Sequence, residues 1–100
     1  MVANLPHVED SQIAEFCRRH GIRRLALFGS ILRDDFNENS DVDVLVEFDP
    51  AAIPGWEFFG MEDELAEIIG RKVDLNTPGF LGKHFRDRVL TEAQDLYVAA

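Results

Sequence analysis

Three β-rich runs alternate with amphipathic stretches along this chain, and the alternation limits the folds that it can adopt. The runs, which turn-forming residues separate, are RRLALFG (23–29), DVDVLVEF (41–48) and KVDLN (72–76). Apolar side chains recur at the three- and four-residue spacing of helices over residues 7–20, 56–69 and 81–95. The order predicts a small α/β domain, in which a short mixed β-sheet of about three strands is flanked by helices.

The length of 100 residues corresponds to one domain, so we expect residues 1–100 to form a single unit. No apolar stretch is long enough to span a bilayer, and the N-terminus lacks the regions of a signal peptide. These features predict a cytoplasmic protein without a membrane partner. The single cysteine, Cys17, excludes an intramolecular disulfide, and its place among apolar helical residues predicts a buried structural thiol.

The chain is acidic, with 10 Lys and Arg against 19 Asp and Glu and a formal net charge of −9. Phosphate contacts dominate the affinity of proteins for nucleic acid, so this charge disfavours DNA or RNA as a partner. If the chain handles phosphates, it must do so locally, through metal ions or a few basic side chains.

Two carboxylates stand on the second β-rich run. Alternation along a strand places Asp41, Asp43 and Leu45 on one face and the intervening valines on the other. The two carboxylates would lie about 7 Å apart, and without a partner they would repel one another and resist burial. A hard divalent cation such as Mg²⁺ prefers oxygen ligands and makes this arrangement favourable.

Gly29 and Ser30 end the first β-rich run. A strand that ends in glycine and continues into a short helix presents backbone N–H groups to an anion, and a serine hydroxyl adds another donor. A Gly–Ser pair or an Asp-x-Asp alone is a weak signal, because each also fits a turn or a solvated strand end. Their combination, with ten residues between them and a strand on either side, is a much stronger indication of a phosphate and metal site.

This combination, Gly29–Ser30, ten residues, then Asp41-x-Asp43, resembles the signature of the DNA polymerase beta-like nucleotidyltransferase superfamily. The stretches GSILR…SDVDVLVEF and GWEFFGMEDELAEIIGRKVDL are especially similar to its minimal nucleotidyltransferases, the MNT-domain antitoxins that are paired with HEPN-domain toxins. The resemblance covers nearly the whole chain.

The resemblance implies three catalytic carboxylates, Asp41, Asp43 and Asp74, which would hold two Mg²⁺ ions. Asp74, in the apolar run KVDLN, would also be the general base on the attacking hydroxyl. Asp74 would face Asp41 and Asp43 if its strand runs antiparallel beside the strand DVDVLVEF. The alternative is an aspartate on an edge strand that points into solvent. ATP is the implied substrate, and the implied nucleotide-binding residues are Gly29, Ser30, Arg33 and Ser40.

One position departs from the family pattern. The family commonly has glycine after the arginine that matches Arg33, whereas this chain has Asp34 and Asp35. The departure bears on the geometry of the turn and adds negative charge near the phosphate site. Arg33 could contact a phosphate or pair with Asp34, Asp35 or Glu38.

Two further groups of side chains have open interpretations. The aromatic residues after a Pro–Gly break are expected mostly in the core, with one available for an interface; they are Trp56, Phe58 and Phe59. A basic run on the last helix could reach a triphosphate or a partner's acidic face, or could be a solvated face; it holds Lys83, His84, Arg86 and Arg88.

The resemblance implies transfer of AMP from ATP to a tyrosine hydroxyl of a cognate HEPN-type ribonuclease toxin, which silences the toxin. A second hypothesis is a non-catalytic antitoxin that neutralises the toxin by binding, although the intact acidic positions and Gly–Ser pair argue against a decayed site. A third is a nucleotidyltransferase subunit that acts on a small molecule or an RNA end, of which the acidity makes RNA less attractive.

Overall fold

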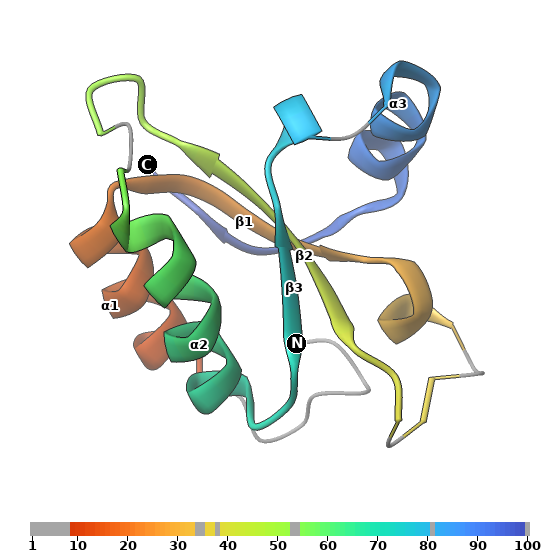
Figure 1. The fold of residues 1–100 in the computed structure, drawn as a ribbon, viewed down its shortest axis with the longest axis horizontal. Helices are drawn as coiled ribbons and strands as arrows, with labels where there is room; N and C mark the ends of the chain where they lie inside the picture. The colour runs from red at the N-terminus through yellow and green to blue at the C-terminus, as the bar shows by residue number, and fades with distance from the viewer. Residues whose placement is uncertain (1–8, 34–35, 38, 53–54, 81, 100) are drawn as a thin grey trace.

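A four-stranded sheet with the strand order β3-β2-β1-β4 forms the centre of the molecule (Figure 1). The computed structural model describes residues 9–33, 36–37, 39–52, 55–80 and 82–99. The strands are β1 Ile22–Phe28, β2 Val42–Phe48, β3 Val73–Asn76 and β4 Gln94–Val98. The helices of the described part are α1 Asp10–His20, η1 Gly29–Leu32, α2 Glu57–Ile69, η2 Pro78–Phe80 and α3 Lys83–Glu92. The small α/β architecture predicted from the sequence is confirmed.

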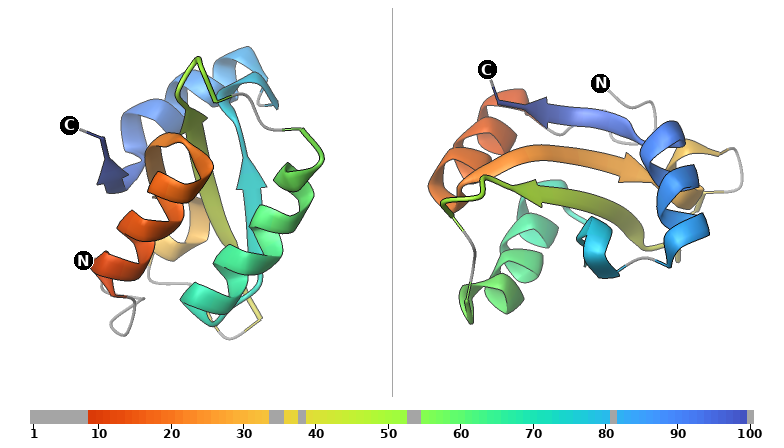
Figure 2. Two further views of the ribbon diagram at one scale, coloured as in Figure 1. Left: turned by 90° about the vertical axis from the view of Figure 1, so that its left-hand side faces the viewer. Right: turned by 90° about the horizontal axis from the view of Figure 1, so that it is seen from above.

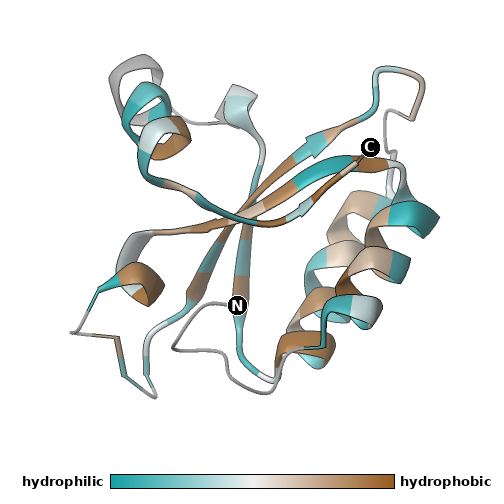
Figure 3. Cartoon of the chain, turned by 180° about the vertical axis from the view of Figure 1, so that it is seen from behind, coloured by the Kyte–Doolittle hydropathy of each residue, from teal (hydrophilic) through white to brown (hydrophobic). Residues whose placement is uncertain are grey.

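Helices α1 and α2 lie side by side against one face of the sheet, and α3 lies against the other (Figure 2). The larger core cluster joins α1 and α2 to the valines of β2 and to alternate residues of β1 and β3. On the opposite face, Val89 of α3 packs with Ala26, Phe28 and Leu45. The predicted alternation along β2 is confirmed, and apolar residues line the strands through the middle of the molecule (Figure 3).

The helix predicted over 7–20 is α1, which begins at Asp10; residues 7 and 8 lie outside the described part. The helix predicted over 56–69 is α2, which begins one residue later, at Glu57. Cys17 on α1 is fully buried, and burial raises the pKa of its thiol to about 12, so it stays protonated. Within the described ranges, no helix is long and apolar enough to cross a membrane.

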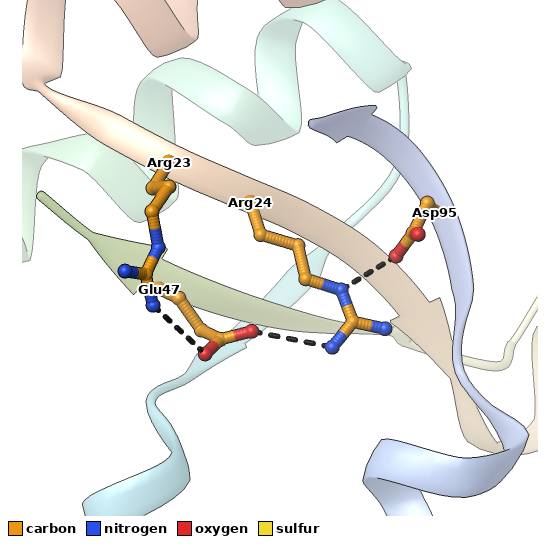
Figure 4. Close-up of polar contacts among 4 residues, drawn as sticks. All are labelled: Arg23, Arg24, Glu47 and Asp95. Atoms are coloured by element: carbon orange, nitrogen blue, oxygen red, sulfur yellow. Dashed lines mark hydrogen bonds and ion pairs between the residues drawn. The ribbon is translucent and has the colours of Figure 1, made fainter. Parts of the chain in front are cut away.

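The end of the chain differs from the helix predicted over 81–95. Helix α3 ends at Glu92, and the following residues form β4, antiparallel to β1, so the sheet has four strands instead of about three. The guanidinium of Arg24 explains part of this preference, because its Nε donates to Oδ1 of Asp95 at 2.6 Å and its Nη1 donates to Oε2 of Glu47 at 3.2 Å (Figure 4). Hydrogen bonds to the open edge of β1 stabilise residues 94–98 as a strand, and they outweigh the local helical pattern of these residues. A local sequence pattern could not reveal this pairing, because β1 and β4 are far apart in the sequence.

Strand β3 runs parallel to β2, so the antiparallel arrangement considered for Asp74 is wrong. The connection between the two strands contains α2, and strands joined through a helix run parallel because the crossover returns the chain to the same end of the sheet. Oε2 of Glu62 on α2 accepts a hydrogen bond from the Leu75 N–H of β3 at 3.0 Å. The starts of β2 and β3 therefore lie side by side.

Two of the three aromatic residues near the start of α2 are exposed, contrary to the prediction of a mostly buried group. The exposed fraction is 88% for Trp56 and 71% for Phe59. Phe58 is half-buried and meets Phe48 edge-on, with ring centroids 6.2 Å apart. The group is therefore anchored to the core by one ring and presents the other two to solvent.

Candidate active site

The end of β1 meets the start of β2 where the two halves of the sequence motif lie. Phe28 pairs with Asp43 across the antiparallel ladder, and Gly29 follows directly. Gly29 has a φ of 76°, and a Cβ atom at this position would lie 2.3 Å from Oδ2 of Asp43. Glycine is required for both the backbone conformation and the close approach. The structure thus brings the Gly–Ser pair and the Asp-x-Asp pair together.

Asp74 lies beside Asp43, because the parallel ladder of β2 and β3 pairs these two positions. Paired residues on neighbouring strands point to the same face of a sheet. Partial burial and then repulsion from Asp74 and Asp41 raise the pKa of the Asp43 carboxyl, and the Arg33 guanidinium opposes the shift. The three carboxylates and Arg33 therefore share one electrostatic neighbourhood.

Within the part of the chain that the structure describes, no three His, Cys, Asp or Glu side chains converge closely enough to hold a metal ion. Asp41 and Asp74 are exposed, and Oδ2 of Asp41 lies 4.0 Å from Nζ of Lys72. The chemistry of the donor set nevertheless fits Mg²⁺, because carboxylates are its preferred protein ligands. A cation there would also relieve the repulsion that raises the pKa of Asp43.

A pocket of about 250 Å³ opens beside Asp43 on the face of the sheet that α3 covers. Its wall, to which Val89 also contributes, includes Phe28, Gly29, Arg33, Asp43, Arg88 and Glu92. Of the described residues predicted to contact nucleotide or metal, four are not part of this wall: Ser30, Ser40, Asp41 and Asp74. The pocket therefore joins the acidic site to two arginines from different segments.

Arg33 contributes to the pocket from the end of η1, a four-residue 3₁₀ helix. Its N–H donates to the carbonyl of Ser30 at 2.9 Å, which closes the turn after Gly29. The proposed alternative partners of Arg33, which are Asp34, Asp35 and Glu38, lie outside the described residues. Arg33 therefore lines the pocket and lies close enough to Asp43 to act on its carboxyl.

The basic run of the last helix reaches the pocket through Arg88, whereas Arg86 is absent from the described wall. The side chains of Lys83 and His84 lie outside the part that the structure describes. The sequence identified the run but could not select Arg88, because the face of a short polar helix is decided by its packing on the sheet.

Ser40 holds the turn before β2. Its Oγ accepts a hydrogen bond from the Asn37 N–H at 3.2 Å, and its own N–H donates to the Asn37 carbonyl at 3.0 Å. Arg71 also stabilises this turn, because its Nη2 donates hydrogen bonds to the carbonyls of Asn37 and of Ser40, the latter at 3.2 Å. Its guanidinium also lies 4.4 Å from the centroid of the Phe36 ring. The sequence reasoning missed Arg71, whose position before β3 was the available signal.

The model of the nucleotidyltransferase-domain family matches residues 10–96. The chain belongs to this family. The protein adenylyltransferase MntA of Thermococcus cleftensis is 37% identical to it over 79 residues, covering 78% of each chain. A Methanocaldococcus jannaschii chain with the provisional name protein adenylyltransferase is 36% identical over 78 residues, covering 78% of this chain and 83% of that one.

Solved structures agree with this assignment. A chain described as a minimal nucleotidyltransferase is 31% identical, with a TM-score of 0.70, and the match covers 84% of this chain and 85% of that chain. The complex of the tri-AMPylated HEPN toxin of Shewanella oneidensis with its MNT antitoxin matches at 20% identity and a TM-score of 0.63, covering 90% of this chain and 70% of that chain. The resemblance to minimal nucleotidyltransferases is confirmed, and the chain is an enzyme of the nucleotidyltransferase class.

Proposed function

We propose that this nucleotidyltransferase transfers AMP from ATP to a tyrosine hydroxyl of a cognate HEPN-type ribonuclease toxin, in a Mg²⁺-dependent reaction, and so acts as its antitoxin. The observation that carries the proposal is the contact of Gly29 with Asp43, beside a pocket that also bears Arg33 and Arg88. The adenylyltransferases among its relatives support AMP as the transferred group. The AMPylated toxin in the Shewanella oneidensis complex supports a toxin as the acceptor.

In this reaction the acceptor hydroxyl oxygen bonds to the α-phosphorus of ATP, the bond to the bridging oxygen breaks, and pyrophosphate leaves. Asp74 would take the hydroxyl proton, and its position beside Asp43 supports this role. Asp41, Asp43 and Asp74 would hold two Mg²⁺ ions. When bound, these ions supply charge neutralisation at the attacking and leaving oxygens.

The phosphates would lie against the end of β1. Gly29 lets the chain approach them closely, and the backbone and hydroxyl of Ser30 add hydrogen-bond donors. Arg33 balances part of their charge from the pocket wall. Ser40 would shape the site through the turn that it closes, in which its hydroxyl oxygen accepts a hydrogen bond from the Asn37 N–H and its own O–H can still donate to a phosphate.

A partner protein would present the acceptor, and the exposed aromatic side chains at the start of α2 offer a surface for it. The Trp56 and Phe59 ring centroids lie 6.3 Å apart. Asp63 is exposed one turn after Phe59, and Glu57 is exposed beside Trp56. A ribonuclease needs basic surface for RNA phosphates, so an acidic surface with aromatic anchors is complementary to it. We therefore assign this surface to the toxin.

The test incubates the purified chain with labelled ATP, Mg²⁺ and the toxin encoded beside it. The label should appear on a tyrosine of the toxin, and pyrophosphate should be released. The variant carrying both Asp41→Asn and Asp43→Asn should lose the transfer and still bind the toxin. Failure of the native chain to transfer AMP, together with neutralisation that survives in this variant, would instead support an antitoxin that acts by binding.

A further inference from the structure

Arg88 and Glu92 of α3 lie in the wall of the pocket beside Asp43, although the proposed AMP transfer gives Glu92 no role. Packing explains their position. Val89 is only 3% exposed and contacts the cluster of Ala26, Phe28 and Leu45 on the sheet. This contact fixes the rotation of α3 about its axis, and residues one turn apart share one side of a helix. Both side chains are thereby held at the pocket.

The two side chains form an ion pair that is easily exchanged. Nε of Arg88 lies 3.4 Å from Oε1 of Glu92, and the side chains are 73% and 63% exposed. Exposed ion pairs contribute little to stability, and an arginine that precedes its carboxylate on a helix has the less favourable order. A polyphosphate offers the guanidinium several anionic oxygens at once and forms stronger charge-assisted hydrogen bonds. A nucleotide in the pocket would therefore displace Glu92 from Arg88.

We propose that Arg88 is a nucleotide-binding residue that contacts the polyphosphate of ATP, and that Glu92 competes with the nucleotide for it. The proposal rests on the proposed function, because it takes ATP as the occupant of the pocket. Arg33 and Arg88 are the basic residues of the described wall, and they approach it from η1 and α3. Glu92 adds negative charge to a site that already holds Asp43. It keeps Arg88 oriented when the pocket is empty and weakens the binding of ATP.

The experiment measures the dissociation constant of ATP by titration calorimetry, with Mg²⁺ present, for the native chain and four variants. Arg88→Gln should raise the dissociation constant about tenfold, as expected for the loss of a charged hydrogen bond. Arg88→Lys keeps the charge without the planar fork and should lie between the two. Glu92→Gln should lower the dissociation constant about threefold, since it removes an exposed competing charge. Arg86→Gln removes the same charge from α3 outside the described wall and should change nothing.

The opposite signs separate this role from a structural one. If the pair only stabilised α3, Arg88→Gln and Glu92→Gln would lower the melting temperature alike and leave the affinity for ATP unchanged; that result would overturn the proposal. Equal affinities of Arg88→Gln and Arg86→Gln would overturn it as well. The loss caused by Arg88→Gln should be smaller for AMP, which lacks the polyphosphate, and an equal loss would contradict the assigned contact. If the native chain does not bind ATP, the proposed function and the proposed role of Arg88 are both wrong. If the native chain binds ATP and Arg88→Gln binds it equally well, only the proposed role of Arg88 is wrong.

Discussion

Asp43 and Asp74 occupy paired positions on two parallel strands, so their carboxylates leave the same face of the sheet. Burial and the two neighbouring carboxylates raise the pKa of Asp43, which means that its negative charge opposes folding at neutral pH. Asp43 is not a member of either core cluster formed by the described residues. An arrangement that lowers stability is expected where the charges serve a ligand, and this cost is consistent with the proposed binding of a divalent cation with a nucleotide.

Asp43→Asn should therefore stabilise the chain while it abolishes AMP transfer. The pKa of Asp43 is higher in the folded than in the unfolded chain. Below about pH 4, the ordinary pKa of aspartate, the carboxyl is protonated in the folded and in the unfolded chain and does not lower stability. The free energy of unfolding falls as the pH rises through the pKa of the folded chain, because the carboxyl then becomes charged in the folded protein. The free energy of unfolding should exceed that of the native chain by about 0.5 kcal/mol at neutral pH, and the difference should vanish in acid.

Thermal unfolding of both proteins at neutral and acid pH checks this sign. The control is Asp63→Asn, which removes an exposed carboxylate of α2 away from the site. A native chain more stable than Asp43→Asn at neutral pH would show that the charge is already compensated in the free protein.

The order of stability should reverse when Mg²⁺ and ATP are added. A ligand that binds only the folded state stabilises it by about 2.7 kcal/mol at one hundred times its dissociation constant. The native chain should gain this stability, measured as a rise in melting temperature. The Asp43→Asn variant should gain little, because it lacks one of the proposed metal ligands. ATP without Mg²⁺ is the control, and an equal gain in both proteins would mean that Asp43 takes no part in binding the nucleotide or the metal.

Gly29→Ala tests the contact between the two halves of the motif. The new Cβ would lie 2.3 Å from Oδ2 of Asp43, and the φ of 76° is strained for alanine, so stability should fall by about 1–2 kcal/mol and ATP binding should weaken. Gly60→Ala is the matched control. Gly60 lies inside α2, and no atom lies within 4 Å of the position that a Cβ would take there. Alanine at this position should therefore raise the free energy of unfolding by about 0.5–1 kcal/mol. Chemical denaturation of both variants gives the comparison, and equal behaviour would refute the contact.

Much of this site could be predicted because it depends on short-range pattern. The apolar runs identified β1 and β2, and the structure pairs these two strands as antiparallel neighbours. The end of one strand then meets the start of the next, which brings Gly29 to Asp43. Asp74 lies beside Asp43 as expected, although the strand direction considered for it is wrong. The helix between β2 and β3 already implies the parallel arrangement, whereas the register of the two strands follows only from the structure.

The rest depends on tertiary contacts that no local pattern contains. Strand β4 forms because β1 has a free edge and because Arg24 binds Asp95, a residue 71 positions away. Arg71 reaches the turn before β2 only because β3 lies beside that strand. Arg88 is selected from a basic run by the packing of Val89 on the sheet. The strand β4 and the positions of Arg71 and Arg88 all depend on neighbours that are close in space and distant in the sequence.

Arg71→Lys should slow AMP transfer without disturbing the core. Lysine cannot reproduce the planar guanidinium that bonds the carbonyl of Ser40 and stacks on Phe36, so the turn before Asp41 should lose its fixed position. Small displacements of catalytic groups reduce rates by about tenfold to a hundredfold, and we expect a fall in this range. Arg18→Lys, at an exposed position of α1, is the control for the same change of side chain. A normal rate in Arg71→Lys would show that the other contacts suffice to hold the turn.

The exposed rings at the start of α2 should contribute to binding of the toxin and not to folding or to ATP. Replacing Trp56 and Phe59 by serine removes aromatic surface that is 88% and 71% exposed, so the melting temperature should change little. Aromatic side chains at the centre of an interface commonly contribute 2 kcal/mol or more, so affinity for the toxin should fall by about thirtyfold or more. Val98→Ser, at an exposed apolar residue of β4, is the control. Unchanged toxin affinity in the double variant would place the interface elsewhere, whereas lost affinity with intact ATP binding would separate docking of the toxin from the chemistry.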